Sequence, residues 1–303
     1  MIQVESVEKA YTSRKNTVRV LERVSLEVRP GEVCALLGRN GSGKTTTIRI
    51  ICGLVLPDAG RVSINGYTLG EPEYMAQFGA LIDTNRGLYP RLSPLENLQY
   101  TCMVRGMSRQ AAVERAKHLL EELGLWDKRN APTQTLSKGM LSKLAFANAI
   151  AHDPPFVLLD EPTLGLDIDA AEALEAQIRQ MAQSGKGILL TTHQMEVAER
   201  LASRVAILSK GRIAVDRPKS ELMAMFARQT YRVVLAEPLL EDILPMAHSL
   251  DETRTVLEVS LEHPRQIYEL MDKLRPAPIK HIERLEADLG EIFKTLTKEP
   301  HHV

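Results

Sequence analysis

The sequence lacks long apolar runs, a metal-type cysteine pattern and an excess of charge of either sign. None of its apolar runs approaches the roughly 18 residues that a membrane-spanning helix needs, and the alternating start, MIQVESVEKAY, does not resemble a secretion signal. The three cysteines, Cys34, Cys52 and Cys102, lie far apart in or near apolar stretches, which predicts buried free thiols and a cytoplasmic compartment. A formal net charge of −1 gives no bulk electrostatic reason to expect nucleic acid or anionic lipid as a partner.

What the sequence does have is enough apolar material for an ample core. Of its 303 residues, 44% are apolar and 25% are charged, as in a soluble globular protein of one large or two ordinary domains. Segments 2–11, 18–32 and 60–69 alternate apolar and polar residues, which predicts a half-exposed, largely antiparallel sheet. The continuously apolar runs EVCALLG, PPFVLLDE and GILLTTH predict a parallel α/β sheet whose strands are buried on both faces.

Between about residues 89 and 151 the pattern becomes helical. Within this region the segment RQAAVERAKHLLEELGL places apolar residues at spacings of three and four. The predicted apolar stripe and the glycine that ends the helix are Val113, Ala116, Leu120, Leu123 and Gly124. We therefore expect a helical subdomain inside a first domain that covers residues 1–216.

Residues 217–303 predict a small accessory α+β domain. Predicted strands alternate with predicted helices along it: 231–236, 253–261 and 279–286 as strands, and 239–250, 264–274 and 288–298 as helices. Residues 216–303 contain 12 basic and 16 acidic side chains, whereas a tail that binds nucleic acid is more often basic. The acidic excess therefore disfavours nucleic acid as a partner of this domain.

Residues 38–45, GRNGSGKT, match the phosphate-binding pattern G-x-x-x-x-G-K-[ST] in full. A buried strand leads in and a helix leads out, which argues against an accidental glycine-rich turn. The glycines let successive N–H groups point at the β- and γ-phosphates, Lys44 adds a positive charge, and the Thr45 hydroxyl can bind Mg²⁺. The predicted nucleotide-binding residues are Gly38, Arg39, Asn40, Gly41, Ser42, Gly43, Lys44, Thr45 and Thr46.

Two further apolar strands end in residues that such a site needs. The strand FVLLDE delivers Asp160, whose carboxylate can hold Mg²⁺, and Glu161, which can accept a proton from an attacking water. Alone, an Asp-Glu strand end is more often solvated, but a phosphate loop in the same chain favours the catalytic interpretation. The strand LLTTH ends in His193, either a structural residue or, as we favour, a contact to the γ-phosphate at the ligand-binding edge of the sheet.

Taken in order, these motifs resemble those of the ATP-binding cassette, the nucleotide-binding domain of ABC proteins. The resemblance covers Met1 to about Asp216 and predicts a P-loop fold with a mixed sheet, an antiparallel subdomain and a helical subdomain. TLGLD, which ends in Asp167, resembles the D-loop of the family. Tyr11 matches the aromatic residue that stacks on adenine, although an isolated surface tyrosine would give the same pattern.

The segment LSKGM, residues 136–140, resembles the family's signature motif, usually written LSGGQ. By itself it is a helix start with Ser137 as N-cap, where free N–H groups favour anions. In the family two cassettes pack head to tail, so that the signature of one faces the phosphate loop of the other. The resemblance therefore implies that Ser137 and the backbone at Gly139 reach a γ-phosphate held by a partner's Lys44.

Several residues depart from the family pattern. Lys138 and Met140 stand where Gly and Gln are usual, and Ser142-Lys143 replaces the common Gln-Arg. Methionine at this position is frequent in exporter cassettes of the ABC-2 type. Asp83 occupies the position of the Q-loop glutamine, where a carboxylate can still hold Mg²⁺ through water.

The resemblance implies an ATP-hydrolysing subunit of an ABC transporter, with ABC-2-type export as the expected process. ATP and Mg²⁺ would close two cassettes, most simply two identical chains, and drive a separate transmembrane permease subunit at the cytoplasmic face of the membrane. Two alternatives stay open. One is an ABC ATPase that acts on nucleic acid or the ribosome, which the acidic second domain disfavours, so no nucleic acid is expected. The other is a regulatory cassette that binds ATP to gate a partner and barely hydrolyses it.

Overall fold

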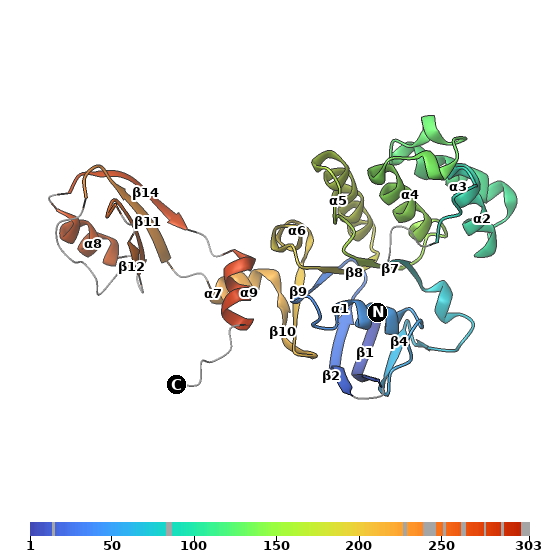
Figure 1. The fold of residues 1–303 in the computed structure, drawn as a ribbon, viewed down its shortest axis with the longest axis horizontal. Coiled ribbons are helices and arrows are strands. Elements are labelled where there is room, and N and C mark those ends of the chain that lie inside the picture. Colours follow the sequence, from blue (N-terminus) through green and yellow to red (C-terminus); the bar gives the residue numbers. More distant parts are fainter. Residues whose placement is uncertain are drawn as a thin grey trace. The chain divides into compact units, whose positions relative to one another are not determined.

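The computed structural model describes residues 1–13, 16–82, 87–226, 229–238, 247–250, 253–261, 265–275, 277–285 and 288–297. The chain divides into two compact units, Met1–Lys219 and Ser220–Val303 (Figure 1). Within the described parts, no helix combines the length and the apolar character that crossing a membrane requires.

The first unit contains an antiparallel sheet in the strand order β2-β1-β4-β5. Its strands are β1 (Ile2–Thr12), β2 (Thr17–Val28), β4 (Ala59–Ile64) and β5 (Tyr67–Thr68). Alternate residues such as Ile2 and Val4 are buried, since successive side chains of a strand point to opposite faces. The antiparallel sheet predicted from the alternating segments is confirmed.

A six-stranded sheet in the order β10-β9-β3-β8-β7-β6 forms the centre of the same unit. It consists of β3 (Val33–Leu37), β6 (Phe78–Leu81), β7 (Phe156–Asp160), β8 (Gly187–Thr192), β9 (Arg204–Ser209) and β10 (Arg212–Pro218). Strands β9, β3, β8, β7 and β6 pair in parallel, and β10 pairs antiparallel with β9. The predicted parallel α/β sheet is confirmed.

This sheet separates two apolar cores, which explains why its strands are continuously apolar. Leu158 and Leu189 lie in a core shared with β1, β2, β4 and α1 (Lys44–Ile51). Val157 and Ile188, one residue earlier on each strand, lie in a core shared with the other helices of the unit. Because neighbouring side chains point to opposite faces, both faces of a strand have to be apolar when both are covered.

Within the second core, one set of helices forms a helical subdomain of its own (Figure 1). This group is α2 (Pro94–Val104), α3 (Arg109–Glu122) and α4 (Lys138–Ile150), together with the short 3-10 helices η2 (Trp126–Lys128) and η3 (Thr133–Thr135). The remaining two helices are α5 (Ile168–Gln183) and α6 (Met195–Leu201), and a 3-10 turn, η1 (Tyr74–Ala76), precedes β6. The side chains of Ser93, Ser108, Ser137 and Asp167 accept hydrogen bonds from backbone N–H groups at the starts of α2, α3, α4 and α5.

The predicted apolar stripe of α3 was wrong at one position. Val113 is 42% exposed, whereas Ala112, Ala116, Leu119 and Leu120 are buried. The buried face is therefore rotated away from Val113, and the small side chain of Ala112 lies in the core instead. Gly124 does end the helix as predicted, with φ +66° and its N–H bonded to the carbonyl of Glu121.

The second unit contains an antiparallel sheet in the order β12-β13-β11-β14. Its elements are α7 (Lys219–Phe226), β11 (Gln229–Leu235), β12 (Ala247–Leu250), β13 (Val256–Leu261), α8 (Gln266–Leu274), β14 (Ile279–Leu285) and α9 (Leu289–Thr297). Val233 and Val259 of the sheet share an apolar core with Leu270 of α8. The helix predicted for 239–250 was wrong over its last four residues, because 247–250 pairs with β13 as a strand; residues 239–246 lie outside the described residues.

Candidate active site

The phosphate-binding loop joins β3 to α1. Gly41 and Gly43 have φ of +81° and +111°, a backbone conformation that side chains rarely adopt. A Cβ on Gly38 would lie 2.3 Å from Ser42 Oγ, so the loop closes tightly on itself. Lys44 is 7% exposed, and its ammonium donates to the carbonyls of Gly38 (2.7 Å) and Arg39 (3.4 Å). The ammonium of Lys44 is therefore held against the carbonyls of its own loop, close to where a phosphate bound by the loop would lie.

Two acidic side chains lie close enough to Lys44 to affect its ionisation. Burial lowers the pKa of the Lys44 ammonium, and the carboxylates of Glu161 and Asp160 oppose that shift. Ser42 Oγ is buried and has no hydrogen-bond partner in the described part of the chain. A buried hydroxyl usually has a partner, so this orphaned group fits a site that a polar ligand completes.

The order of the strands brings Asp160 and Glu161 to this loop. Strand β8 lies between β3 and β7, with Leu37 opposite Thr192 and Asp160 opposite Thr191. The Thr191 hydroxyl donates to one oxygen of Asp160, and the Thr191 carbonyl accepts from the N–H of Glu161 at 3.0 Å. Thr191 thus orients both acidic residues, a role that the sequence does not predict although Thr191 belongs to the segment TTH.

Glu161 and His193 form a direct pair. Glu161 Oε1 lies 2.7 Å from His193 Nδ1, and the side chain of Glu161 is 20% exposed. Glu161 also has φ +50°, which is uncommon for a residue other than glycine. Backbone conformations of this kind gather at functional sites, where the surrounding structure enforces them. The structure therefore brings together Lys44, Asp160, Glu161 and His193.

The signature and the D-loop form a second group. The Ser137 hydroxyl accepts from the N–H of Met140 at 3.3 Å and starts α4, while Asp167 Oδ1 accepts from the N–H of Ala170 at 2.8 Å and starts α5. A Cβ on Gly139 would lie 3.6 Å from the Cβ of Ala170 and 3.8 Å from Asp167 Oδ2. Among the described residues, no hydrogen bond or ion pair joins this group to the phosphate loop.

The remaining predicted residues lie as follows. Tyr11 is the penultimate residue of β1 and is 44% exposed, with the Lys9 ammonium 5.7 Å from the centre of its ring. Thr46 is in the first turn of α1 and is half-buried. Asp83 lies outside the described residues. All three cysteines are buried and unpaired, as predicted, and burial raises the pKa of Cys52 to about 12.

A glycine-rich loop between a parallel strand and a helix, with a buried lysine near two acidic strand ends, defines a P-loop nucleotide-binding protein. Comparison with known proteins narrows this class. A family model for "ABC transporter" matches residues 21–164. The chain is 30% identical, over 98% of both chains, to the linearmycin resistance ATP-binding protein LnrL of Bacillus subtilis (strain 168). It is 33% identical to the Nod factor export ATP-binding protein I of Burkholderia pseudomallei (strain 1710b), covering 98% of this chain and 96% of that protein.

Solved structures of ABC transporter cassettes also match the chain. The ATP-binding subunit of an ABC transporter matches with a TM-score of 0.67 and 35% identity, covering 75% of this chain and 93% of the other. The dimeric ABC transporter cassette MJ0796 matches with a TM-score of 0.66 and 28% identity, covering 72% of this chain and 98% of the other. The same cassette is also known as a dimer in a post-hydrolysis state with ADP and Pi.

The chain therefore belongs to the ATP-binding proteins of ABC transporters. It is the ATP-binding, ATP-hydrolysing subunit of such a transporter, and its family implies dimerisation and a membrane partner. The predicted family, fold and ATPase activity are confirmed. The comparisons give no support to the alternative of an ATPase that acts on nucleic acid or the ribosome.

Proposed function

We propose that the chain powers export through a separate transmembrane permease subunit, as an ABC-2-type ATPase at the cytoplasmic face of the membrane. Among its full-length relatives, one is named for linearmycin resistance and one for Nod factor export. The observation that carries the ATPase mechanism is the 2.7 Å pair between Glu161 and His193 at the strand ends beside Lys44. This geometry suits water-dependent transfer of the γ-phosphoryl group.

In this mechanism Glu161 Oε accepts a proton from the attacking water, and His193 holds the carboxylate and contacts the γ-phosphate. Lys44 turns its ammonium from the loop carbonyls to the β- and γ-phosphates. Tyr11 is the proposed contact to adenine. The Ser42 hydroxyl, buried without a described partner, is a ready donor to a phosphate oxygen.

The oxygen groups beside the loop suit Mg²⁺, which prefers carboxylate and hydroxyl ligands together with phosphate oxygens. The Thr45 hydroxyl and the second oxygen of Asp160 accept no hydrogen bond from the described residues. We propose these two groups as ligands; Mg²⁺ neutralises charge on the phosphates when it is bound. The proposal that Asp83 assists through water stays a prediction.

We further propose that the nucleotide site is completed by a second, identical chain. The signature group of Ser137, Gly139 and Asp167 has no polar contact to the phosphate loop of its own chain within the described residues, and similar cassettes are dimers. Its free N–H groups at the start of α4 are suited to an anion. In a head-to-tail dimer this group would face the nucleotide bound at Lys44 of the partner.

Replacing Ser137 with alanine tests this arrangement. On its own, the Ser137→Ala chain is expected to lose about 10²-fold in turnover, as when one preorganised phosphate-directed donor is removed. Mixed with an inactive Lys44→Ala chain, it should regain turnover, because a mixed dimer combines an intact phosphate loop with an intact signature. Phosphate release measured at several mixing ratios shows whether turnover is regained. A mixture as inactive as its components would contradict a shared site.

A patch of exposed apolar side chains is the proposed docking surface for the permease. It consists of Leu54, Leu56, Met75, Met103 and Val104. The patch residues lie on three chain segments, 54–56, 75 and 103–104, and two hydrogen bonds join these segments. The Tyr74 hydroxyl donates to the Ile51 carbonyl at 2.6 Å and Arg105 donates to the Met75 carbonyl at 2.6 Å. Exposed apolar patches of this kind mark sites of protein interaction.

Val104→Glu should detach the chain from membranes without impairing hydrolysis. Val104 is 65% exposed at the end of α2, so the substitution places a charge on the patch and leaves the core intact. We expect the washed membrane fraction of cells that express the variant to hold about tenfold less of the chain, which corresponds to about 1.4 kcal/mol of lost binding. The matched control is Val113→Glu on the exposed face of α3. Equal membrane binding by both variants would contradict the proposed surface.

A further inference from the structure

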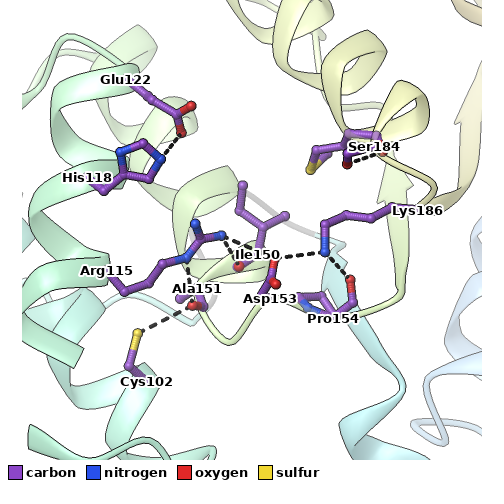
Figure 2. A network of polar contacts seen from close by, with 11 residues as sticks. Cys102, Arg115, His118, Glu122, Ile150, Ala151, Asp153, Pro154, Ser184 and Lys186 are labelled. Carbon is purple, nitrogen blue, oxygen red and sulfur yellow. Dashed lines mark hydrogen bonds and ion pairs between the residues drawn. The ribbon is translucent and has the colours of Figure 1, made fainter. Parts of the chain in front are cut away.

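The C-terminal end of the signature helix α4 is held by a cluster of polar contacts (Figure 2). Arg115 of α3 donates to the carbonyls of Ile150 and Ala151, both at 3.3 Å. These carbonyls are at the end of α4, where the last C=O groups lack partners within the helix and a cation is favoured. Cys102 Sγ, from α2, lies 3.5 Å from the same carbonyl of Ala151. Both other helices of the group therefore contact this end of α4.

Asp153 links the same end to the central sheet. It follows α4 by three residues and has φ +57°, a conformation that turns the chain sharply towards β7. Its Oδ1 lies 2.8 Å from the ammonium of Lys186 and 3.6 Å from the guanidinium of Arg115 (Figure 2). Lys186, just before β8, also donates to the carbonyl of Pro154 at 2.8 Å. The hydrogen bond from Lys186 is the main cause of a lowered pKa for the Asp153 carboxyl. One carboxylate thus joins a cation of the helical group to a cation of the sheet.

The backbone at this junction lies directly against β6. A Cβ on Gly79 would lie 1.9 Å from the carbonyl oxygen of Ala149 and 3.1 Å from the ring of Pro154, so only glycine fits there. His152 Nε2 contacts the carbonyl of Phe78, on the same strand, at 3.2 Å. Close packing of this kind leaves the C-terminal end of α4 little freedom to translate. A change in the direction of α4 would therefore pivot about this end.

The other end of α4 is the signature. The helix has 13 residues and is about 20 Å long, so a turn of about 10° at Asp153 would move Ser137 by about 3 Å. Among the described residues, the Ser137 side chain makes a polar contact only within its own helix, to the N–H of Met140. Along its length α4 packs in the second apolar core, and the contacts at its C-terminal end add directional polar restraints to that packing.

We propose that Asp153, Arg115 and Lys186 form the pivot that directs α4, and that they position Ser137 at the nucleotide of the partner chain. This inference rests on the shared site proposed above. The three residues act through α4 and touch neither nucleotide. If the carboxylate of Asp153 is lost, Arg115 and Lys186 are two cations with no common partner, and the helical group loses an ionic link to the sheet.

The test is the full-length Asp153→Asn chain. Its turnover is expected to fall by about tenfold, because misplacing a reacting group by about 1 Å can cost as much as 10²-fold. Its affinity for ATP in the presence of EDTA should stay unchanged, since its own phosphate loop is intact. Adding an excess of the inactive Lys44→Ala chain should restore turnover per Asp153→Asn chain, because the Lys44→Ala partner supplies a correctly directed signature.

Control variants distinguish a failure of the proposed pivot from a failure of the proposed shared site. Glu121→Gln removes a carboxylate that pairs with Lys117 at 3.8 Å on the exposed side of α3, and it should leave turnover unchanged. Lys186→Met breaks the same link from the sheet side and should repeat the result of Asp153→Asn. If Ser137→Ala is rescued by Lys44→Ala and Asp153→Asn is not, the pivot is overturned while the shared site stands. If neither is rescued, the shared site itself fails. Wild-type turnover in both Asp153→Asn and Lys186→Met, or a lower melting temperature as their sole effect, would also overturn the pivot.

Discussion

Glu161→Gln is expected to lower ATP turnover by at least about 10²-fold while leaving ATP bound, the loss that removing a general base produces. Glutamine has the size of glutamate and can still contact His193, but it cannot take a proton from water. The 2.7 Å pair with His193 and the unusual backbone of Glu161 hold the carboxylate in one orientation, which suits the proposed role. Because ATP would bind without being hydrolysed, the closed dimer should accumulate.

Two measurements check this expectation. Phosphate release reports the turnover, and size-exclusion chromatography with ATP and Mg²⁺ reports the dimer. The control is Glu172→Gln, which changes an exposed glutamate on α5 and should behave like the wild-type chain. Undiminished turnover in Glu161→Gln would remove this residue from the mechanism.

Lys44→Ala should abolish tight nucleotide binding. Lys44 is 7% exposed, and the hydrogen bond of its ammonium to the Gly38 carbonyl would give way to stronger, charge-assisted bonds to phosphate oxygens. Losing hydrogen bonds to a charged group costs about 1.5–3 kcal/mol, which corresponds to roughly 10- to 150-fold in affinity. The variant should therefore bind ATP weakly and hydrolyse none of it.

Calorimetric titration with ATP measures the affinity, and Lys128→Ala, at an exposed lysine of η2, serves as the control. Tight binding of ATP by Lys44→Ala would refute the assignment of the phosphate loop. A preserved circular dichroism spectrum would show that the loss arises at the site. The carbonyl of Gly38 would then be free to bind water in place of the lysine.

The phosphate loop could be predicted from the sequence because its chemistry is local. Its glycines, Lys44 and Thr45 lie within residues 38–45, and the strand and the helix around them are each predicted from a short pattern. The two-sided burial of the central strands could be predicted in the same way, since a run such as Val33–Leu37 has no polar face. The cap of α4 by Ser137 is likewise a property of a few neighbouring residues.

The errors occurred where several packings satisfy one pattern. On α3, a stripe through Val113 and one through Ala112 differ by a single position, and only the neighbouring helices decide which side is covered. Residues 247–250 are compatible with a helix end by composition, but pairing with β13 decides in favour of a strand. In both cases the deciding contact comes from a segment distant in the sequence.

The sequence alone determined the glycine-rich loop between a strand and a helix, which strand ends carry acids, and where α4 begins, because these properties depend on adjacent residues. Only the tertiary structure decided that Glu161 pairs with His193, that Thr191 orients Asp160, and that Asp153 meets both Arg115 and Lys186. Each of these contacts joins residues more than 30 positions apart in sequence, and it exists because β8 lies beside β7 and α3 packs on the end of α4. The order of strands and the packing of helices bring such groups within hydrogen-bonding distance, and a local sequence pattern specifies neither the strand order nor the helix packing.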